Sequence, residues 1–431
     1  MSEAARAAAL WDQRRHAEAI DIFRTLHDRT PSDAAITLRL GIALYLVGRL
    51  DEATDVLEPL SRRAADDDPV HDWLGRALAT LHWHQRGPDA IAPLRDAVAQ
   101  HPGDPLRHMQ LAHALLSCGR LAEAWPHYAW RWQDLPAGHH VPGGALARPD
   151  PASWRGRRVL LFPEQGLGDM LQFLRYVPLV MAQGAQVTVE IPAPLRRLAA
   201  TLPGRPAVVV TGEPVPPHDV AIPLMNLPWA FGTDLSTIPG GIPYFTPEPH
   251  AVATWRDRLA RLPGQKIGLV WAGEPRAFDA SAYRIDRRRS LKLAALAPLA
   301  QIPGVTFVSL QKGAGAAQAA TPPPGMTLHD WTAELADYAD TAALVQALDL
   351  VISVDTSPVH MAGSLGRPVW MLGRYDSCYR WLRDREGSPQ GSPWYPTLRL
   401  YRQQQRLQWS APLQALAKDL NAMRADPMAP K

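Results

Sequence analysis

The sequence predicts a segment of paired helices followed by two α/β units, and three observations lead to this expectation. Residues 1–133 are rich in Ala and Leu and repeat their apolar landmarks about every 34 residues. From residue 157 onward, apolar runs typical of β-strands alternate with helical patterns, as in parallel sheets covered by helices. With 431 residues, of which 46% are hydrophobic, the chain can form two or three packed domains.

The N-terminal segment carries four copies of one helix-pair pattern. In the second helices the landmarks are Ala19, Ile20 and Phe23, then Ala53 and Leu57, then Ala90, Ile91 and Leu94, then Ala124 and Tyr128. In the first helices they are Leu40, Gly41 and Leu44, then Leu74, Gly75 and Leu78, then Leu111, Ala112 and Leu115. The pattern resembles tetratricopeptide repeats, whose concave groove binds peptides or proteins. The alternative is that the repeats serve only as a brace or a dimer interface.

Each α/β unit is expected to contain four strands. They are 158–162, 187–191, 207–211 and 220–222 in the first unit, and 266–271, 305–310, 349–354 and 368–372 in the second. The predicted divisions are a repeat domain over 1–133, a linker over 134–156, α/β domains over 157–250 and 251–405, and a helix and tail over 406–431. We expect the helix at 411–423 to brace the first α/β unit.

Two strand-to-helix junctions carry polar residues that point to a ligand. After the strand at 158–162 come Gln165, Gly166, Gly168 and Asp169, ahead of a helix expected over 170–181. After the strand at 349–354 come Asp355, Thr356 and Ser357, ahead of a short helix that stops near Gly366. The free N–H groups and the dipole of a helix start attract anions, so phosphate or pyrophosphate is the expected ligand. Ligands of such sheets bind beyond the carboxyl ends of the strands, so both junctions should face one cleft.

Composition excludes several other classes. The net charge is only +3, which gives no electrostatic footprint for nucleic acid. With Cys118 and Cys378 as its only cysteines, the chain has too few for a disulfide scaffold or a cysteine zinc site, and a reduced, cytoplasmic location fits best. No apolar run is long enough to span a membrane, so membrane contact would be peripheral. The 15 histidines show no metal-ligand spacing.

Five motifs, in their order along the chain, resemble those of bacterial tetratricopeptide-repeat glycosyltransferases with a heptosyltransferase-like, glycosyltransferase family 9-like catalytic region. The motifs are 164–169 (EQGLGD), 268–273 (GLVWAG), 305–312 (VTFVSLQK), 353–356 (SVDT) and 392–396 (SPWYP). The resemblance implies a GT-B fold, in which two Rossmann-like domains face each other. It also implies a nucleotide-sugar as substrate, with no bound metal or other cofactor.

The resemblance assigns roles to individual residues. Asp169 matches the proposed base of the family, although capping alone also favours an Asp in a first helical turn. The acceptor-side loop is formed by Gln165, Gly166 and Gly168. The donor-side residues in the matching motifs are Ser353, Asp355, Thr356, Ser357, His360, Gln311 and Lys312. The arginine run is not part of those motifs: Arg287, Arg288 and Arg289 are expected either to clamp phosphates through bidentate contacts or to form an ordinary solvated run. His360 is equally explained as an ordinary helix residue. The loop 273–275 (GEP) and the longer stretch after it depart from the family, so the donor sugar is not predicted.

The expected function is inverting, metal-independent transfer of a sugar from a nucleotide-sugar to a protein or glycan. The repeats would recruit the acceptor, for which flagellin is one possibility. Two alternatives remain: a sugar-nucleotide epimerase with the same architecture, and a catalytically inactive adaptor that only binds a nucleotide-sugar. The aromatic residues at 379–381 and 394–395 fit either stacking on a ligand ring or ordinary core packing.

Overall fold

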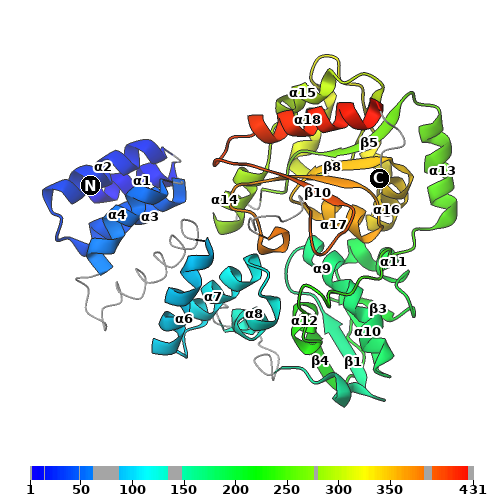
Figure 1. The fold of residues 1–431 in the computed structure, drawn as a ribbon, viewed down its shortest axis with the longest axis horizontal. Coiled ribbons are helices and arrows are strands. Elements are labelled where there is room, and N and C mark those ends of the chain that lie inside the picture. Colours follow the sequence, from blue (N-terminus) through cyan, green and yellow to red (C-terminus); the bar gives the residue numbers. More distant parts are fainter. Residues whose placement is uncertain are drawn as a thin grey trace. The chain divides into compact units, whose positions relative to one another are not determined.

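The computed structural model describes residues 2–13, 15–47, 49–61, 87–133, 148–275, 280–382 and 391–425. The chain divides into two compact units. The helical unit comprises Met1–Cys118 and Pro126–His139, and the α/β unit comprises Gly119–Trp125 and His140–Lys431. Figure 1 shows helices in the first of these and two sheets with their covering helices in the second.

The predicted repeat helices are present in the described part of the helical unit. They are α1 (Glu3–Asp12), α2 (His16–Arg29), α3 (Ala34–Val47), α4 (Leu50–Ser61), η1 (Gly87–Ala90), α6 (Ile91–Gln100), α7 (Pro105–Ser117) and η2 (Ala129–Trp132), with α8 (Leu121–Tyr128) where the chain passes between the units. The landmarks Phe23, Leu44 and Leu57 share one buried core. Gly41 lies so close to Leu57 that a side chain there would overlap it, which explains the small residue. The landmarks at 74, 75 and 78 lie outside the described residues.

The first sheet has the strand order β3-β2-β1-β4, and all its pairs are parallel. Its strands are β1 (Arg158–Phe162), β2 (Gln186–Ile191), β3 (Ala207–Val210) and β4 (Val220–Pro223), each within one residue of the prediction. Its helical segments are α9 (Leu167–Phe173), η4 (Leu174–Tyr176), α10 (Val177–Ala182), η5 (Ala193–Leu195), α11 (Arg196–Ala199), η6 (Leu224–Asn226) and α12 (Leu227–Ala230). The helix expected over 170–181 is thus divided, because Pro178 lacks an N–H and begins a new helix instead.

The second sheet has the order β10-β9-β8-β5-β6-β7, again with parallel pairs. Its strands are β5 (Gln265–Val270), β6 (Val305–Ser309), β7 (Leu328–Asp330), β8 (Leu350–Val354), β9 (Val369–Gly373) and β10 (Leu398–Arg402). Four of these were predicted, whereas β7 and β10 were missed. The two sheets confirm the predicted pair of Rossmann-like halves. The domain boundary at residue 250 stays a prediction.

Helices of several lengths accompany the second sheet. They are α13 (Pro249–Ala260), α14 (Ala280–Arg289), η7 (Leu293–Leu296), α15 (Ala297–Ala300), η8 (Gly313–Ala320), η9 (Thr332–Glu334), α16 (Tyr338–Ala347), α17 (Ser357–Ser364), η10 (Tyr379–Trp381) and α18 (Ser410–Ala425). None of the helices in the described ranges is long and apolar enough to cross a membrane.

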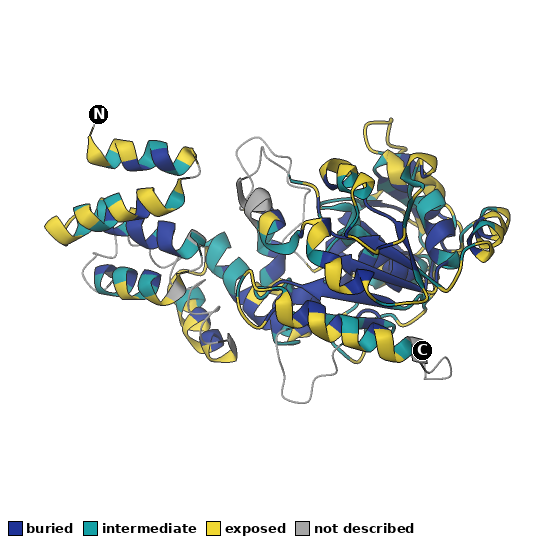
Figure 2. Ribbon diagram, turned by 90° about the horizontal axis from the view of Figure 1, so that it is seen from above, coloured by how far each residue is buried: buried dark blue, intermediate teal, exposed yellow. Residues whose placement is uncertain are grey.

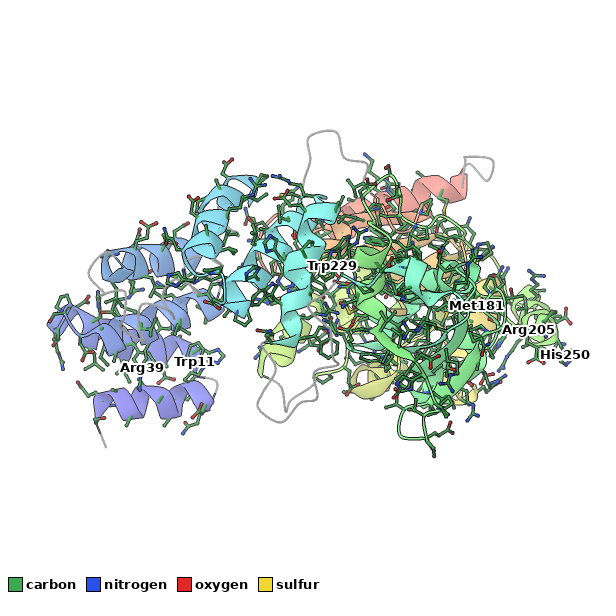
Figure 3. All side chains as sticks on the ribbon, turned by 90° about the horizontal axis from the view of Figure 1, so that it is seen from below. Trp11, Arg39, Met181, Arg205, Trp229 and His250 are labelled. Atoms are coloured by element: carbon green, nitrogen blue, oxygen red, sulfur yellow. The ribbon has the colours of Figure 1, made fainter. Side chains whose placement is uncertain are left out.

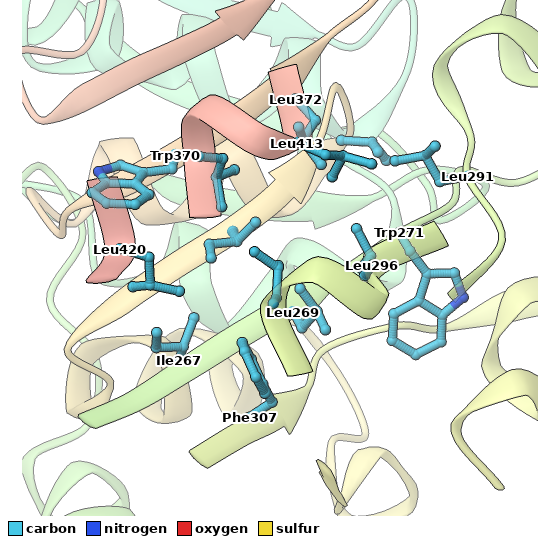
Figure 4. Close-up of a cluster of buried hydrophobic side chains, with 14 of the residues drawn as sticks. Ile267, Leu269, Trp271, Leu291, Leu296, Phe307, Trp370, Leu372, Leu413 and Leu420 are labelled. Carbon is cyan, nitrogen blue, oxygen red and sulfur yellow. The ribbon is translucent and has the colours of Figure 1, made fainter. Parts of the chain in front are cut away.

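The C-terminal helix packs against the second sheet, not the first. Its residues Leu413, Leu416 and Leu420 belong to the same buried cluster as Ile267 and Phe307 of β5 and β6 (Figure 4). The expectation that this helix braces the first α/β unit is therefore wrong. An apolar face on a helix predicts that this face is buried, but it does not predict which sheet covers it.

Burial follows the layered architecture. In Figure 2 the strands are dark blue and the outer faces of the helices are yellow. Charged side chains such as Arg39, Arg205 and His250 are exposed (Figure 3). Strand β1 ends on the half-buried Phe162 and β8 on the buried Val354, and beyond them Asp169 and Thr356 are half-buried whereas Gln165 is exposed.

Candidate active site

The first junction places Asp169 in the opening turn of α9. Gly166 precedes the helix in an extended conformation, and its N–H donates a 2.8 Å hydrogen bond to Oδ2 of Asp169. The carboxylate therefore caps the helix from within, as the capping alternative expected. Gln165 is exposed, whereas Gly166 and Gly168 are half-buried.

The other carboxylate oxygen of Asp169 contacts a guanidinium from the second half of the α/β unit. Nη2 of Arg380, in η10, lies 2.5 Å from Oδ1 of Asp169. Nε of Arg380 donates a 2.7 Å hydrogen bond to Oε1 of Gln172, one helical turn further along α9. No local pattern predicts this pairing, because the two partners are more than 200 residues apart along the chain.

The second junction directs its hydroxyl groups back to the strand. Thr356 donates to the main-chain oxygen of Val354 at 3.1 Å, and Ser353 donates to the same oxygen at 2.7 Å. The Ser357 hydroxyl lies 2.5 Å from that of Tyr338. Thr356 precedes α17 but makes no side-chain cap hydrogen bond to it.

The two junctions lie against each other. A Cβ atom added to Gly168 would stand 2.8 Å from Cδ2 of His360 and 3.5 Å from Cα of Ser357. Only glycine allows α9 and α17 to approach this closely at that point. The structure therefore brings Gly168, the neighbour of Asp169, against Ser357 of the 355–357 turn, whereas a ligand cleft shared by the two junctions stays a prediction.

His360 is a buried member of this contact. Its Nδ1 lies 3.0 Å from the hydroxyl of Tyr395, and its ring packs against Trp381. Burial, and then the nearby guanidinium groups of Arg380 and Arg175, lower the pKa of His360 well below 6.5. The imidazole is consequently neutral at physiological pH.

The three consecutive arginines have three different environments. Arg289 donates a 2.9 Å hydrogen bond from Nη1 to the main-chain oxygen of Asp355, and its Nε contacts Asp286 at 3.1 Å. Arg288 forms an ion pair of 3.1 Å with Asp376, and Arg287 is exposed. Only Arg289 of the three is seen in contact with the second junction among the described residues.

Gln311 and Lys312 hold loops at the carboxyl end of the second sheet. Oε1 of Gln311 accepts from the N–H groups of Trp271 and Ala272 at 3.0 and 2.8 Å, and its Nε2 donates to the oxygen of Ala272 at 2.9 Å. Nζ of Lys312 donates to the oxygens of Thr332 and Leu335 at 2.8 and 2.5 Å. A direct role of these side chains toward a donor stays a prediction.

A further charged residue that the sequence did not single out lies beside the site. Arg175 is 4% exposed and donates from Nη1 to the oxygen of Trp394 at 3.0 Å and from Nε to the oxygen of Gln172 at 3.0 Å. Its guanidinium also lies 4.9 Å from the ring centre of Tyr395. An arginine within the otherwise apolar run that follows α9 is the signal that could have revealed it.

Across the part of the chain that the structure describes, no three or more His, Cys, Asp or Glu side chains are grouped so that they could hold a metal ion.

The N-terminal helices match a known protein family. Residues 10–77 match the family model of the tetratricopeptide repeat. The chain is thus similar to tetratricopeptide repeats over these residues. The prediction made from the spacing of the landmarks is thereby confirmed over these residues.

One relative and two solved structures are similar to larger parts of the chain. The chain is 29% identical over 452 residues to protein FlbA of Caulobacter vibrioides, across 97% of this chain and 72% of FlbA. The structure of the E. coli ADP-heptose lipopolysaccharide heptosyltransferase II is similar with a TM-score of 0.44 and 15% identity, over 63% of this chain and 100% of that one. A family 9 glycosyltransferase from Veillonella parvula is similar with a TM-score of 0.42 and 10% identity, over 58% and 87%.

Proposed function

We propose that the protein is a glycosyltransferase that moves a sugar from a nucleotide-sugar to a protein or glycan acceptor. The observation that carries this proposal is the contact of Gly168 with His360 and Ser357. Gly168 precedes Asp169 and Ser357 begins α17, so this contact supports a site in which a carboxylate and an anion-attracting helix start, from two different halves of the α/β unit, act together. Sugar transfer needs such a pair, because a base and a group that stabilises the leaving diphosphate must act on one bound substrate.

The donor side is formed by the start of α17 and by Arg289. The helix dipole and the first-turn N–H groups favour a diphosphate at this position. Arg289 adds a guanidinium within hydrogen-bonding distance of the Asp355 backbone. These groups supply the positive charge that a departing nucleoside diphosphate requires, so we propose transfer without a resident metal.

The acceptor side is formed by Asp169 and its loop. In the proposed step, the acceptor oxygen forms a bond to the anomeric carbon while the bond from that carbon to the diphosphate oxygen breaks. The acceptor proton passes to the Asp169 carboxylate, and the diphosphate leaves with the electron pair. Attack from the face opposite the leaving group inverts the anomeric centre.

The tetratricopeptide repeats are proposed to recruit the acceptor. Repeats of this type present a groove to peptides and proteins, which makes a protein acceptor such as flagellin the preferred possibility. We place the reaction in the cytoplasm, which agrees with a chain that has only two cysteines, Cys118 and Cys378.

A catalytically inactive adaptor is the second candidate. The observation in its favour is that both oxygens of Asp169 already have partners, namely the Gly166 N–H and Arg380. Such an adaptor would bind a nucleotide-sugar through α17 and Arg289 but would leave it intact.

A ligand panel followed by one variant separates these candidates. ADP, UDP, GDP and CDP, and sugars attached to them, are added to the full chain while its melting temperature is followed. A ligand at 100 times its Kd stabilises the folded protein by about 2.7 kcal/mol, so the cognate nucleotide should raise Tm clearly. If none of these ligands raises Tm, the proposal that this site binds a nucleotide-sugar donor is wrong.

The variant Asp169→Asn then tests the base. We expect it to bind the same nucleotide while turnover falls about 10²- to 10⁴-fold, the usual contribution of a general base. Binding with unchanged turnover would remove Asp169 from the mechanism. Binding without any turnover in the native chain, toward protein, glycan or water, would favour the adaptor.

A further inference from the structure

Arg380 connects the two halves of the α/β unit at the predicted base. It belongs to η10, which follows β9, yet its contacts reach two side chains of α9: Asp169 at 2.5 Å and Gln172 at 2.7 Å. The residue is 6% exposed. A guanidinium this deep in the protein is not a solvated surface charge, so its contacts with α9 have a fixed geometry.

The contact with Arg380 settles the orientation of the carboxylate. The terminal torsion of an aspartate is broad, so a carboxylate bound through one oxygen samples many orientations. Here Oδ2 accepts from the Gly166 N–H, which belongs to the same half, and Oδ1 contacts Arg380, which belongs to the other half. Two contacts from different directions fix the plane of the group.

Arg380 is itself held in place. Gln172 accepts from its Nε, and Gln172 has no exposed surface. The guanidinium carbon lies 4.4 Å from the ring centre of Tyr379 and 5.7 Å from that of Phe173. The planar fork of arginine presents Nε to Gln172 and Nη2 to Asp169 in one fixed geometry, which the flexible ammonium of a lysine does not reproduce.

We propose that Arg380 is a positioning residue of the transferase. It aligns the Asp169 carboxylate of the first half from the second half, so the base is oriented only where the two halves meet. This proposal rests on the proposed function, since it assigns Arg380 a task that exists only if Asp169 accepts a proton. In this proposal Arg380 acts only through Asp169 and does not contact the donor.

A double-variant cycle in the full chain tests this role. The probes are UDP-, ADP-, GDP- and CDP-linked sugars, and the readouts are release of the nucleoside diphosphate and the Kd of the free nucleotide. We expect Arg380→Met to lower kcat about 10- to 100-fold, the effect of losing one charge-assisted hydrogen bond. The nucleotide Kd should change less than about threefold, and Arg380→Lys should recover part of kcat, because it restores the charge without the fork.

The decisive comparison is made in the Asp169→Asn background. If Arg380 acts only through Asp169, adding Arg380→Met there should leave the remaining kcat unchanged. An equal loss in both backgrounds, or an undiminished kcat in Arg380→Met alone, would overturn the proposal. The matched control is Arg196→Met, which removes an exposed arginine paired with Glu213 and should leave kcat unchanged.

The outcomes also separate this inference from the proposed function. If the native chain turns over none of the nucleotide-sugars, the transferase itself fails, and Arg380 has no base to position. If the native chain is active and Arg380→Met is equally active, only the role of Arg380 fails. Melting temperatures of all variants show whether a loss of kcat reflects unfolding.

Discussion

The guanidinium of Arg289 donates a 2.9 Å hydrogen bond to the main-chain oxygen of Asp355. It thereby joins the last residue of α14 to the turn between β8 and α17, 66 residues further along the chain. Consecutive residues of a helix point about 100° apart, so three neighbouring arginines cannot all face one site. This explains why Arg288 contacts Asp376 instead and Arg287 is exposed.

The first prediction concerns this arginine. Arg289→Met should weaken binding of the cognate nucleoside diphosphate about 10- to 100-fold, because one charge-assisted contact is lost. Isothermal titration calorimetry measures the effect. Arg287→Met is the control, since it removes the same charge from an exposed position of the same helix and should change the Kd less than about threefold. Equal losses in the two variants would mean that only the overall charge matters.

The second prediction concerns the contact between the two junctions. Gly168→Ala should destabilise the protein by about 1–3 kcal/mol, because its methyl group would meet the buried ring of His360 and one of the two helices must shift. Urea unfolding measures the loss. Gly240→Ala, at a position with no neighbour within 4 Å, should be nearly neutral. A neutral Gly168→Ala would show that α9 and α17 are not held together as described.

The third prediction concerns pH. The folded-state pKa of His360 is lowered, so the unfolded chain binds a proton first as the pH falls below about 6.5, and stability is lost there. His360→Gln removes this contribution while keeping a polar partner for Tyr395. The native protein should therefore exceed the variant in unfolding free energy at pH 8, and the gap should narrow by up to about 2 kcal/mol at pH 5. A gap that is equal at both values would contradict the burial of a neutral imidazole.

The fourth prediction concerns the loop after β5. Gln311→Leu would leave the N–H groups of Trp271 and Ala272 without their acceptor, at about 1–3 kcal/mol for each buried group. Chemical denaturation should show the loss. Gln301→Leu, at an exposed position, is the control. If the Gln311 variant keeps its stability but loses nucleotide affinity, the side chain contacts the donor instead of the loop.

Strands with long apolar runs were predictable, whereas the edges of the second sheet were not. Strand β7 has three residues and contains His329 and Asp330, and β10 alternates Leu398 and Leu400 with arginines. Both lie at the edge of the sheet, where one side of the strand has no partner and polar residues are tolerated. A pattern search that relies on buried runs misses such strands.

The site was predictable where local sequence determines it. The junction residues Asp169 and Thr356 follow their strands after short connections, so their places at helix starts could be expected. Contacts made across the fold left no local signal, as Arg380 with Asp169 and Gln311 with Trp271 show. These depend on how two distant segments meet, which no short window of sequence encodes.

The buried guanidinium of Arg175 limits how the catalytic region can be recombined. Its hydrogen bonds end on Gln172 in one half and on Trp394 in the other. In a chimera that joins the first half of this chain to the second half of a relative, the buried guanidinium of Arg175 would lose an acceptor. The foreign segment would have to offer a carbonyl oxygen at the same place. Exchanging the halves of such proteins therefore calls for moving the 392–396 segment together with η4, which carries Arg175.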